Sequence, residues 1–355
     1  MKRIEFHNRE KETKEILDLL DSEPSLITFV YGPINSGKTT LINHLIGQLQ
    51  GGYATFYINL RGRFITDYED FLNVLFEIDE GGVIDNISEY AQSALKDLKI
   101  LSGIPIPTNL FEQIFEKKDK SKDMFRYIES LFAEISKKRV PVLVIDELQV
   151  IGDMKINGLL IYKLFNFFVR LTKELHLAHI FVITSDSLFI ERIYSEAMLS
   201  GRCRYLAVDD FDYETTMDFL DKYNFNDMEK EVAWEYCGGK PVCLVELVSR
   251  EKREEKAREM LGIRTGQIEG LIEDAKEFGY KISYDKEEIV LNDEDLLKGI
   301  ERFGSEEYLK AGELPKPIKL GLIKANILFL DPVKQIIKPQ SQLNLLAIRR
   351  VLEGV

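Results

Sequence analysis

The segment Gly32–Thr39, GPINSGKT, fits the pattern G-x-x-x-x-G-K-[ST] and constrains the fold of this chain more than any other feature. A short apolar run, SLITFVY, precedes it, and TTLINHLIGQL, with apolar residues at helical spacing, follows it. This order of strand, glycine-rich loop and helix is the context that a phosphate-binding loop requires. The plain alternative is a glycine-rich turn before an ordinary helix, but that alternative gives no reason for Lys-Thr after the second glycine.

The residue types in this segment match the chemistry of phosphate binding. Gly32 and Gly37 allow the backbone to curl with its N–H groups directed inward, and a helix that starts near Lys38 adds the positive end of its dipole. Lys38 is expected to reach the β- and γ-phosphates and to act in catalysis, and the Thr39 hydroxyl is expected to bind Mg²⁺. The predicted nucleotide contacts are Gly32, Pro33, Ile34, Asn35, Ser36, Gly37, Lys38, Thr39 and Thr40.

A continuous apolar run, Val140–Ile145, predicts a strand buried on both faces of a parallel sheet. Asp146 follows at the carboxyl end of this strand, where α/β sheets place ligand groups, and we expect it to support Mg²⁺ opposite Thr39. Glu147 is then the predicted general base that activates the attacking water. In the alternative interpretation, the Asp-Glu pair only starts a loop or caps a helix.

The segment LAHIFVITSD predicts a further strand with polar residues at its tip. A catalytic glutamate beside the strand aspartate is typical of P-loop enzymes with an extra strand between the loop strand and the carboxylate strand, and this segment fits that extra strand. Thr184 or Ser185 at the tip is a candidate to contact the γ-phosphate or to orient the water. For each of them, a helix-capping role is an equally fitting interpretation.

Composition and charge limit the functions open to the chain. Its 355 residues suit two or three domains, and 45% apolar with 30% charged residues indicate a folded protein. The net charge of −13 gives no global signature of nucleic-acid binding. Because neither a long apolar run nor an apolar N-terminal segment is present, we expect a cytoplasmic protein that binds no membrane. Three cysteines without C-x-x-C spacing indicate neither a disulfide framework nor a zinc site.

Three further segments make the chain resemble the archaeal ATPase family, AAA+-related and STAND-like P-loop proteins that are distantly similar to the Orc/Cdc6 initiators. EFHNREKETKEILDLL is similar to the family's F-x-x-R-E-x-E box, MLSGRCRYLAVDDF to the segment leading into the last sheet strand, and YCGGKPVCL to the G-x-P motif of the STAND lid. The resemblance implies an α/β P-loop NTPase fold. Its parallel sheet would have a strand inserted between the P-loop and Walker B strands, followed by a helical lid and a winged-helix-like α+β C-terminal region.

The resemblance also implies roles for single residues. Asn8 and Arg9 would contact the adenine or ribose, whereas the residues alone suggest an amphipathic helix start with Asn8 as N-cap. Pro241, with Gly239, would bring the lid against the nucleotide. A helix-ending glycine and a helix-starting proline are a sufficient explanation of the same pair.

Two arginines before the last predicted strand are candidates for catalysis. Arg202, or alternatively Arg204, is predicted as an arginine finger or γ-phosphate sensor, and a surface arginine before a strand is the plainer interpretation. We find no clear sensor-2 arginine, which is unlike oligomeric AAA+ motors. We therefore expect a monomer or weak oligomer.

The predicted domains are a P-loop ATPase core at 1–210 with a helical insertion at about 61–122, a helical lid at 211–250, and a winged-helix-like domain at 251–355. In the insertion, YEDFLNVLFEI predicts a helix and SGIPIPTNLF a proline-containing loop. In the last domain, YKISYDKEEIVLN predicts a hairpin turning at Asp285–Lys286, and LGLIKANILFLDPVKQIIKP a second one turning at Asp331–Pro332. A helix followed by a hairpin is typical of a winged helix. Its basic residues are sparse, so a protein partner fits at least as well as DNA.

Together, these patterns predict Mg²⁺-dependent binding and hydrolysis of ATP that drives a conformational change between the nucleotide core and the C-terminal domain. An adenine nucleotide, ATP or ADP, is the expected ligand, and an unidentified protein or DNA would bind the C-terminal region. Two alternatives stay open. One is a slow, ADP- or ATP-loaded switch of the STAND type, and the other is a DNA-associated ATPase with a winged-helix DNA-binding domain.

Overall fold

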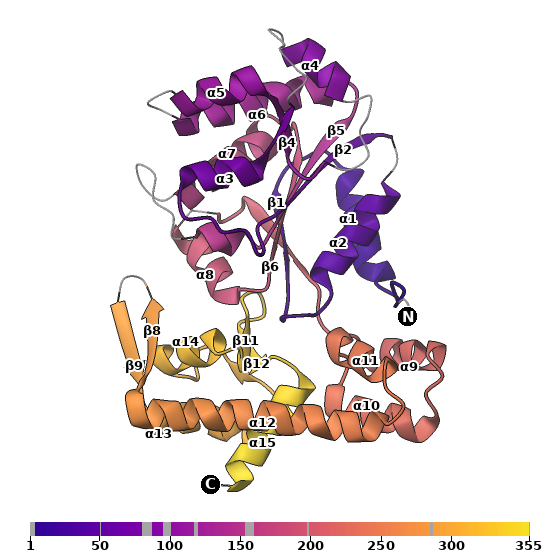
Figure 1. Cartoon of the computed structure of the whole chain (residues 1–355), viewed down its shortest axis with the longest axis vertical. Helices are drawn as coiled ribbons and strands as arrows, with labels where there is room; N and C mark the ends of the chain where they lie inside the picture. Colours follow the sequence, from indigo (N-terminus) through magenta and orange to yellow (C-terminus); the bar gives the residue numbers. More distant parts are fainter. Residues whose placement is uncertain are drawn as a thin grey trace. The chain divides into compact units, whose positions relative to one another are not determined.

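The chain divides into two compact units (Figure 1). The computed structural model describes residues 4–49, 51–79, 87–94, 101–116, 120–152, 160–196, 199–284 and 287–354. The sheet unit comprises Arg9–Tyr31 and Lys38–Ala207. The C-terminal unit comprises Val208–Val355 together with the pieces Met1–Asn8 and Gly32–Gly37. The domain boundaries that the sequence suggests after residues 210 and 250 stay predictions.

The sheet unit is built on five parallel strands in the order β2-β5-β6-β1-β7. These strands are β1 Ile27–Tyr31, β2 Tyr53–Asn59, β5 Val140–Asp146, β6 His179–Thr184 and β7 Cys203–Ala207. Because β6 lies between β1 and β5, the structure confirms the predicted α/β class and its inserted strand. Every residue of β1 and of β6 is buried, as expected of strands that helices cover on both faces.

Helices lie on both faces of this sheet. Figure 1 shows α1 (Glu10–Leu20) and α2 (Lys38–Gln48) on one side, and α7 (Leu160–Val169) and α8 (Ser187–Glu196) on the other. The apolar residues Leu160, Leu164, Phe165 and Phe168 of α7 are buried, and the ring of Phe165 stacks on Phe29 of β1 with centroids 5.6 Å apart. After α7 the chain continues as one π-helical turn, Arg170–Glu174. The segment KLFNFFVRLTKEL is therefore part of the core, as its helical spacing predicts.

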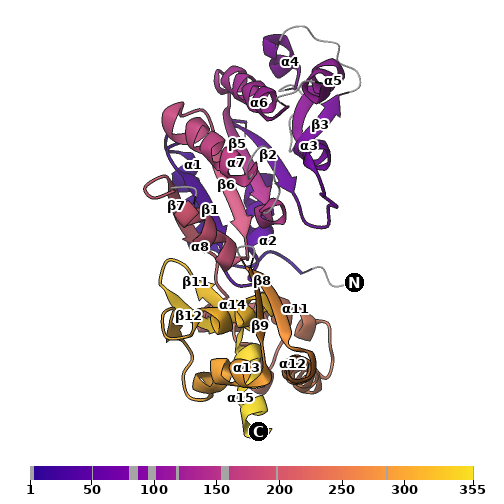
Figure 2. The same ribbon diagram turned by 90° about the vertical axis from the view of Figure 1, so that its left-hand side faces the viewer.

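The segment between β2 and β5 contains two strands that the sequence does not predict. The helix expected for YEDFLNVLFEI ends at Leu75 (α3, Tyr68–Leu75), and Phe76–Asp79 forms β3. Ile104–Pro107, expected as a loop, forms β4 parallel to β3, because a two-stranded sheet has open edges at which proline is tolerated. Figure 2 shows β3 grouped with α4 (Ile87–Ala94), α5 (Thr108–Glu116) and α6 (Lys120–Ser136).

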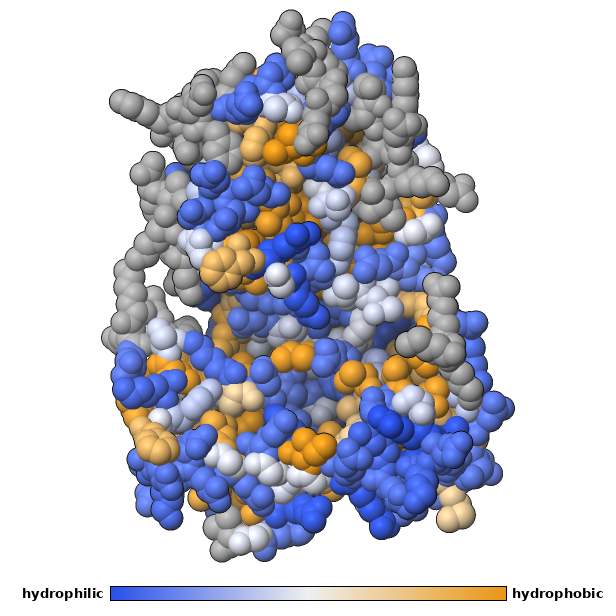
Figure 3. Space-filling model, viewed as in Figure 1, coloured by the Kyte–Doolittle hydropathy of each residue, from blue (hydrophilic) through white to orange (hydrophobic). Residues whose placement is uncertain are grey.

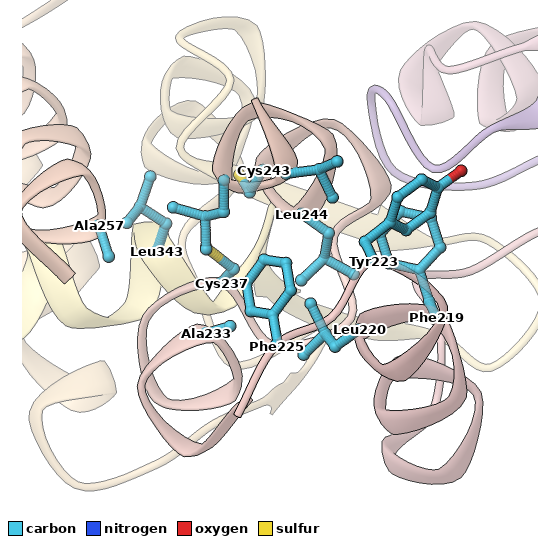
Figure 4. Packing of buried hydrophobic residues seen from close by; sticks show 12 residues of the cluster. Phe219, Leu220, Tyr223, Phe225, Ala233, Cys237, Cys243, Leu244, Ala257 and Leu343 are labelled. Carbon is cyan, nitrogen blue, oxygen red and sulfur yellow. The ribbon is translucent and has the colours of Figure 1, made fainter. Parts of the chain in front are cut away.

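In the C-terminal unit, the helix α12 (Arg253–Phe278) runs along most of the other elements (Figure 1). Three helices pack near its N-terminal half, namely α9 (Tyr213–Lys222), α10 (Asp227–Cys237) and α11 (Pro241–Val248). Figure 4 shows their shared core, in which Cys237 and Leu244 lie near Leu343 of α15 (Gln342–Gly354). The surface over this part is mostly hydrophilic in Figure 3, in agreement with the charged start of α12. In the described part of the chain, no helix is long and apolar enough to cross a membrane.

Among the described residues, the remaining elements of this unit are two antiparallel sheets, the helices α13 (Asp293–Ile300) and α14 (Lys316–Lys324), and the 3₁₀ turn Glu301–Gly304. β8 (Tyr280–Tyr284) pairs with β9 (Glu287–Leu291) as predicted, and the expected turn residues Asp285–Lys286 lie outside the described residues. The second predicted hairpin is formed by β11 (Leu328–Asp331) and β12 (Ile336–Pro339), to which β10 (Leu309–Lys310) adds a third strand.

The first part of that second predicted hairpin is a helix instead. LGLIK belongs to α14 (Lys316–Lys324), so the prediction of a strand for this segment is wrong. Ile318 and Leu322 are four residues apart, and both lie against Gly299 of α13 (Asp293–Ile300), where a Cβ would come within 2.4 and 2.5 Å of them. This packing on one helical face explains the helix.

Candidate nucleotide-binding site

Contacts within the C-terminal unit hold the glycine-rich loop. The hydroxyl of Ser36 donates a hydrogen bond to the carbonyl oxygen of Val208 at 2.6 Å. The ammonium group of Lys240 donates to the carbonyl oxygen of Ile34 at 3.0 Å, and the amide of Ile34 donates to Oε1 of Gln340 at 3.2 Å. A Cβ on Gly32 would lie 2.1 Å from the carbonyl oxygen of Val208, so only glycine fits there.

The loop backbone has the conformation that a nest of N–H groups requires. Asn35 and Gly37 have φ angles of 60° and 94°, in the left-handed region that glycine and asparagine adopt most readily. Left-handed residues at close spacing turn successive N–H groups toward one side of the backbone. Lys38 follows Gly37 and begins α2, so the positive end of a helix dipole comes next in the chain. The nucleotide contacts assigned to Gly32–Thr40 stay predictions.

In the sheet unit, Asp146 lies at the end of β5 and is 1% exposed. Its Oδ2 accepts hydrogen bonds from the hydroxyls of Thr39, at 2.8 Å, and Tyr57, at 2.9 Å. Its Oδ1 has no hydrogen-bond partner among the described residues. Burial raises the pKa of Asp146 above the ordinary value of an aspartate, although the two hydroxyls act in the opposite direction. A buried carboxylate with one unsatisfied oxygen therefore stands beside Thr39.

This arrangement fits Mg²⁺, which takes oxygen ligands and is held in proteins through one or two carboxylates. Thr39 and Asp146 are the residues that would hold it, as the sequence predicts. A cation beside Oδ1 would offset the cost of the buried charge, because an opposite charge favours the ionised form of a carboxylate.

Tyr57 belongs to this group, and sequence reasoning misses it. It lies on β2 opposite Val144 of β5, and its hydroxyl reaches Asp146 across the pair of strands. Burial raises the pKa of Tyr57 above its ordinary value, so the hydroxyl stays protonated and donates at neutral pH. The run ATFYINL predicts the strand, but only the register with β5 brings this side chain to the aspartate.

The carboxylate of Glu147 is held on both oxygens. Oε1 accepts a hydrogen bond from the guanidinium of Arg61, and Oε2 accepts one from the side-chain amide of Gln149. The bond to Glu147 raises the pKa of Arg61 above its ordinary value. In turn, Oε1 of Gln149 accepts from the hydroxyl of Thr184 at 2.9 Å. Thr184 rather than Ser185 is thus the strand-tip residue connected to Glu147, while the predicted nucleotide contact of Ser185 stays a prediction.

Arg61 and Gln149 are also absent from the sequence-based set of site residues. Arg61 comes two residues after the end of β2, and Gln149 lies in the short 3₁₀ turn Leu148–Ile151. The backbone of Glu147 itself is left-handed, with φ 63°, and its amide donates to the carbonyl oxygen of Ile183 at 3.0 Å. A non-glycine residue in this conformation costs on the order of 1–3 kcal/mol, and such strain is concentrated at functional sites.

At the N-terminus, the interpretation of Asn8 as a helix cap is wrong. The residue at the N-cap position of α1 is Arg9, with φ 88° and no side-chain cap. Asn8 instead donates from its side-chain amide to the hydroxyl of Thr215 at 2.9 Å. Arg9 pairs with Glu12 at 2.8 Å. The adenine contacts that the resemblance implies for Asn8 and Arg9 stay predictions.

Arg202 directly precedes β7, an edge strand that lies three strands away from β5 and Asp146. The strand registers place Asp146 level with Leu206, so Arg202 is four residues, or about 13 Å, farther back along the strand direction. The neighbouring candidate, Arg204, donates to the hydroxyl of Ser25 at 2.9 Å. Arg202 therefore lies away from Asp146 along the strand direction, and its role as an arginine finger or γ-phosphate sensor stays a prediction.

In the segment with Gly239 and Pro241, the helix-starting proline is confirmed, whereas the glycine that ends α10 is Gly238 rather than Gly239. Pro241 is the first residue of α11, where its fixed φ is suited to a helix start. A Cβ on Gly239 would lie 1.7 Å from the carbonyl oxygen of Phe211, so a close backbone approach requires this glycine. A nucleotide contact of Pro241 stays a prediction.

Comparison with known proteins gives matches along nearly the whole chain. Residues 6–247 match a protein family described as an ATPase domain predominantly from Archaea, and residues 254–352 match the C-terminal domain of an uncharacterized, MJ1010-like ATP-binding protein. A curated ATP-binding protein of Methanocaldococcus jannaschii is 44% identical over 99% of this chain and 98% of its own.

Two solved structures also match. A Walker-type ATPase of Pyrococcus abyssi has a TM-score of 0.61 at 17% identity, over 97% of this chain and 96% of its own. The ORC2 protein of Aeropyrum pernix has a TM-score of 0.44 at 11% identity, over 99% of this chain and 94% of its own.

Proposed function

The chain belongs to the family of ATPase domains found predominantly in Archaea, and from this premise we propose that it hydrolyses ATP with Mg²⁺ and couples the reaction to a change in its C-terminal unit. ATP binding is shared with the related protein of Methanocaldococcus jannaschii, which is named for it. The single observation that carries hydrolysis is Glu147 directly after the buried Asp146, with both of its carboxylate oxygens held in place.

In the proposed reaction, Glu147 accepts a proton from a water molecule as the water oxygen attacks the γ-phosphorus. The bond between the γ-phosphorus and the β–γ bridging oxygen breaks, and ADP and phosphate leave. Lys38 and the loop N–H groups bind the phosphate oxygens, while Asp146 and Thr39 would hold Mg²⁺. The cation would neutralise the charge that develops on the phosphate oxygens.

Coupling to the C-terminal unit is supported by the contacts of the loop. Gly32–Gly37 forms part of that unit, and its carbonyl, amide and hydroxyl groups bond to Lys240, Gln340 and Val208. A phosphate bound by this loop would therefore act directly on the surroundings of these three residues. The lid role of residues 211–250 and the winged-helix form of 251–355 belong to the same proposal.

A slow nucleotide switch is the second candidate, and one observation favours it. In this structure the carboxylate of Glu147 already accepts hydrogen bonds from Arg61 and Gln149, and these two donors compete with an attacking water for the carboxylate. Turnover would be slow while both bonds persist.

DNA binding through the C-terminal region has less support. Residues 251–355 hold 18 Lys and Arg against 20 Asp and Glu. The helix before the hairpin, α14, packs against β8 and β9, where a Cβ on Gly321 would lie 2.3 Å from Leu291. Lys324 of α14 donates to the carbonyl oxygen of Ser283. We therefore expect a protein partner rather than DNA.

The test is ATP hydrolysis by the purified chain with Mg²⁺, compared with the variant Glu147→Gln. We expect the variant to lose at least about 100-fold in rate, because a positioned general base contributes roughly 10²–10⁴-fold, while ADP binding is unchanged. Glu129→Gln is the matched control, since Glu129 pairs with Arg170 away from these residues. If the wild-type chain binds ATP but does not hydrolyse it, the enzyme proposal is wrong and the switch is supported.

A further inference from the structure

Four consecutive residues, Val208–Phe211, form a junction in the C-terminal unit. Val208 accepts a hydrogen bond from Ser36 of the glycine-rich loop at 2.6 Å. Each of the next three residues contacts an element later in the chain: Asp209 pairs with Lys338 at 2.7 Å, Asp210 pairs with Lys240 at 2.9 Å, and the amide of Phe211 donates to Gly239 at 2.9 Å. This junction therefore joins the loop, the start of α11 and the end of β12.

The peptide groups on either side of Ile34 are bonded to two of these later elements. Its carbonyl accepts from Lys240, 206 residues later, and its amide donates to Gln340, 306 residues later. A six-residue loop such as Gly32–Gly37 does not need side chains from distant parts of the sequence to satisfy its carbonyl and amide groups, because a loop at the surface can bond to water. The two bonds therefore fix the loop conformation from outside the loop.

Both side chains are themselves held firmly. The side chain of Lys240 is 4% exposed and its ammonium lies between Asp210 and the carbonyl of Ile34, because a buried ammonium without partners is costly. Gln340 is 8% exposed, its side-chain amide donates to the carbonyl of Leu328, and its backbone amide donates to the carbonyl of Ile327. A shift of α11 or of the β11–β12 hairpin would thus pull directly on the peptides of Ile34.

We propose that Lys240 and Gln340 are positioning residues for the nucleotide phosphates, and that phosphate binding at the loop is transmitted through them to α11 and the β11–β12 hairpin. This proposal rests on the proposed nucleotide function of the loop but not on hydrolysis. The two effects are reciprocal, since whatever fixes the loop in its binding form raises the affinity, and the bound nucleotide stabilises the same contacts by the same factor.

The first test is ADP binding by calorimetry to Lys240→Met and Gln340→Met, together with the melting temperature of each variant without nucleotide. Loss of a neutral hydrogen bond is worth about two- to tenfold and loss of a charge-assisted one about tenfold or more, so we expect affinity losses in these ranges for Gln340→Met and Lys240→Met. Gln340→Glu keeps an acceptor for the Ile34 amide but loses the donor to Leu328, so it is expected to lose less affinity than Gln340→Met even where it lowers the melting temperature.

Lys338→Met is the matched control. It removes the lysine from the neighbouring pair with Asp209, in the same junction, without touching the loop. We expect it to lower the melting temperature but to change ADP affinity less than about twofold. Equal affinity losses for Lys338→Met and Lys240→Met would overturn the proposal, because the effect would then be one of general stability.

The second test uses the wild-type chain, so it does not depend on whether a variant folds. Hydrogen exchange of the backbone amides in Ile327–Gln340 is measured with and without ADP, and we expect slower exchange when ADP is bound. Unchanged exchange there, with ADP bound at saturation, would also overturn the proposal. Because both tests use ADP, a chain that fails to hydrolyse ATP would contradict the proposed enzyme activity and leave this result intact.

Discussion

The carboxyl edge of the central sheet, where its parallel strands end, and the amino edge, where they begin, both hold buried polar groups. These groups are organised differently at the two edges. At the carboxyl edge, Asp146 has an oxygen without a hydrogen-bond partner among the described residues, and at the amino edge the same holds for Nε2 of His179 and Nε of Arg204. Buried polar atoms without a hydrogen-bond partner therefore occur at both edges and do not distinguish them. The difference is convergence, by which we mean that side chains from several elements contact one group: hydroxyls from α2 and β2 both donate to Asp146.

The backbone conformation and the side-chain contacts also differ between the two edges. Glu147 at the carboxyl edge is left-handed, and its carboxylate is bonded to Arg61, which follows β2, and to Gln149 of the next 3₁₀ turn. At the amino edge, Arg204 bonds to Ser25, just before the neighbouring strand β1. Convergence combined with backbone strain is the mark of a functional site, whereas an isolated buried polar group is a cost that the fold tolerates. Substitutions at the two edges should therefore separate activity from stability.

The largest effect is expected for Asp146→Asn. ATP hydrolysis should fall about 1,000-fold, because the variant lacks the carboxylate proposed to hold Mg²⁺, and several kcal/mol of charge stabilisation would be lost from the reaction. The melting temperature without nucleotide should rise by about 1–3 °C. The folded-state pKa of Asp146 is raised, so its charged form disfavours folding above that pKa, and the neutral amide removes this cost.

The control for this prediction is Asp18→Asn, an exposed aspartate on α1. It should change neither rate nor melting temperature beyond error. A lower melting temperature for Asp146→Asn would show that the aspartate stabilises the fold, and the contrast between the edges would then fail at its strongest point.

The parts of this site that the sequence predicts are those set by short-range patterns. The strand before Gly32, the helix from Lys38 and the strand ending at Asp146 all follow from continuous apolar runs and glycine spacing. The insertion of one strand between β1 and β5 follows from the Asp-Glu pair and is confirmed by the position of β6.

Long-range contacts are what the sequence leaves out. Tyr57 reaches Asp146 only because β2 pairs with β5 in one register, and the peptide groups of Ile34 meet Gln340 306 residues later. The prolines of Ile104–Pro107 suggest a loop, yet pairing with β3 makes this segment a strand. No local periodicity carries such information, because it depends on which elements pack together.

His179 provides the corresponding test of the amino edge. Burial lowers its pKa to about 4, against about 6.5 for an unperturbed histidine, so the unfolded chain binds a proton that the folded chain excludes. Its contribution to stability is complete above pH 6.5 and is lost as the pH falls toward 4. From pH 7 to pH 4, the wild-type chain should therefore lose roughly 2–4 kcal/mol more unfolding free energy than His179→Gln.

Urea unfolding at several pH values measures this difference, and ATP hydrolysis at pH 7.5 serves as the second measurement. Hydrolysis by His179→Gln should stay within about twofold of the wild-type rate, because the histidine begins β6 at the edge away from Asp146. A tenfold loss of rate with unchanged stability would contradict the view that buried polar groups at the amino edge are only structural.

The smallest effect is expected for Arg61→Ala, and it tests what the convergence on Glu147 does. The guanidinium holds the carboxylate of the proposed base, so its removal should raise the basal rate of ATP hydrolysis. Because 62% of the Arg61 side chain is exposed, the pair is worth at most about 1 kcal/mol, which corresponds to an increase of roughly two- to fivefold. Arg63→Ala, an exposed arginine of the same loop, is the control and should leave the rate unchanged. If Arg61→Ala lowers the rate instead, the arginine orients the carboxylate of Glu147 rather than restraining it. The contacts on Glu147 would then contribute directly to catalysis.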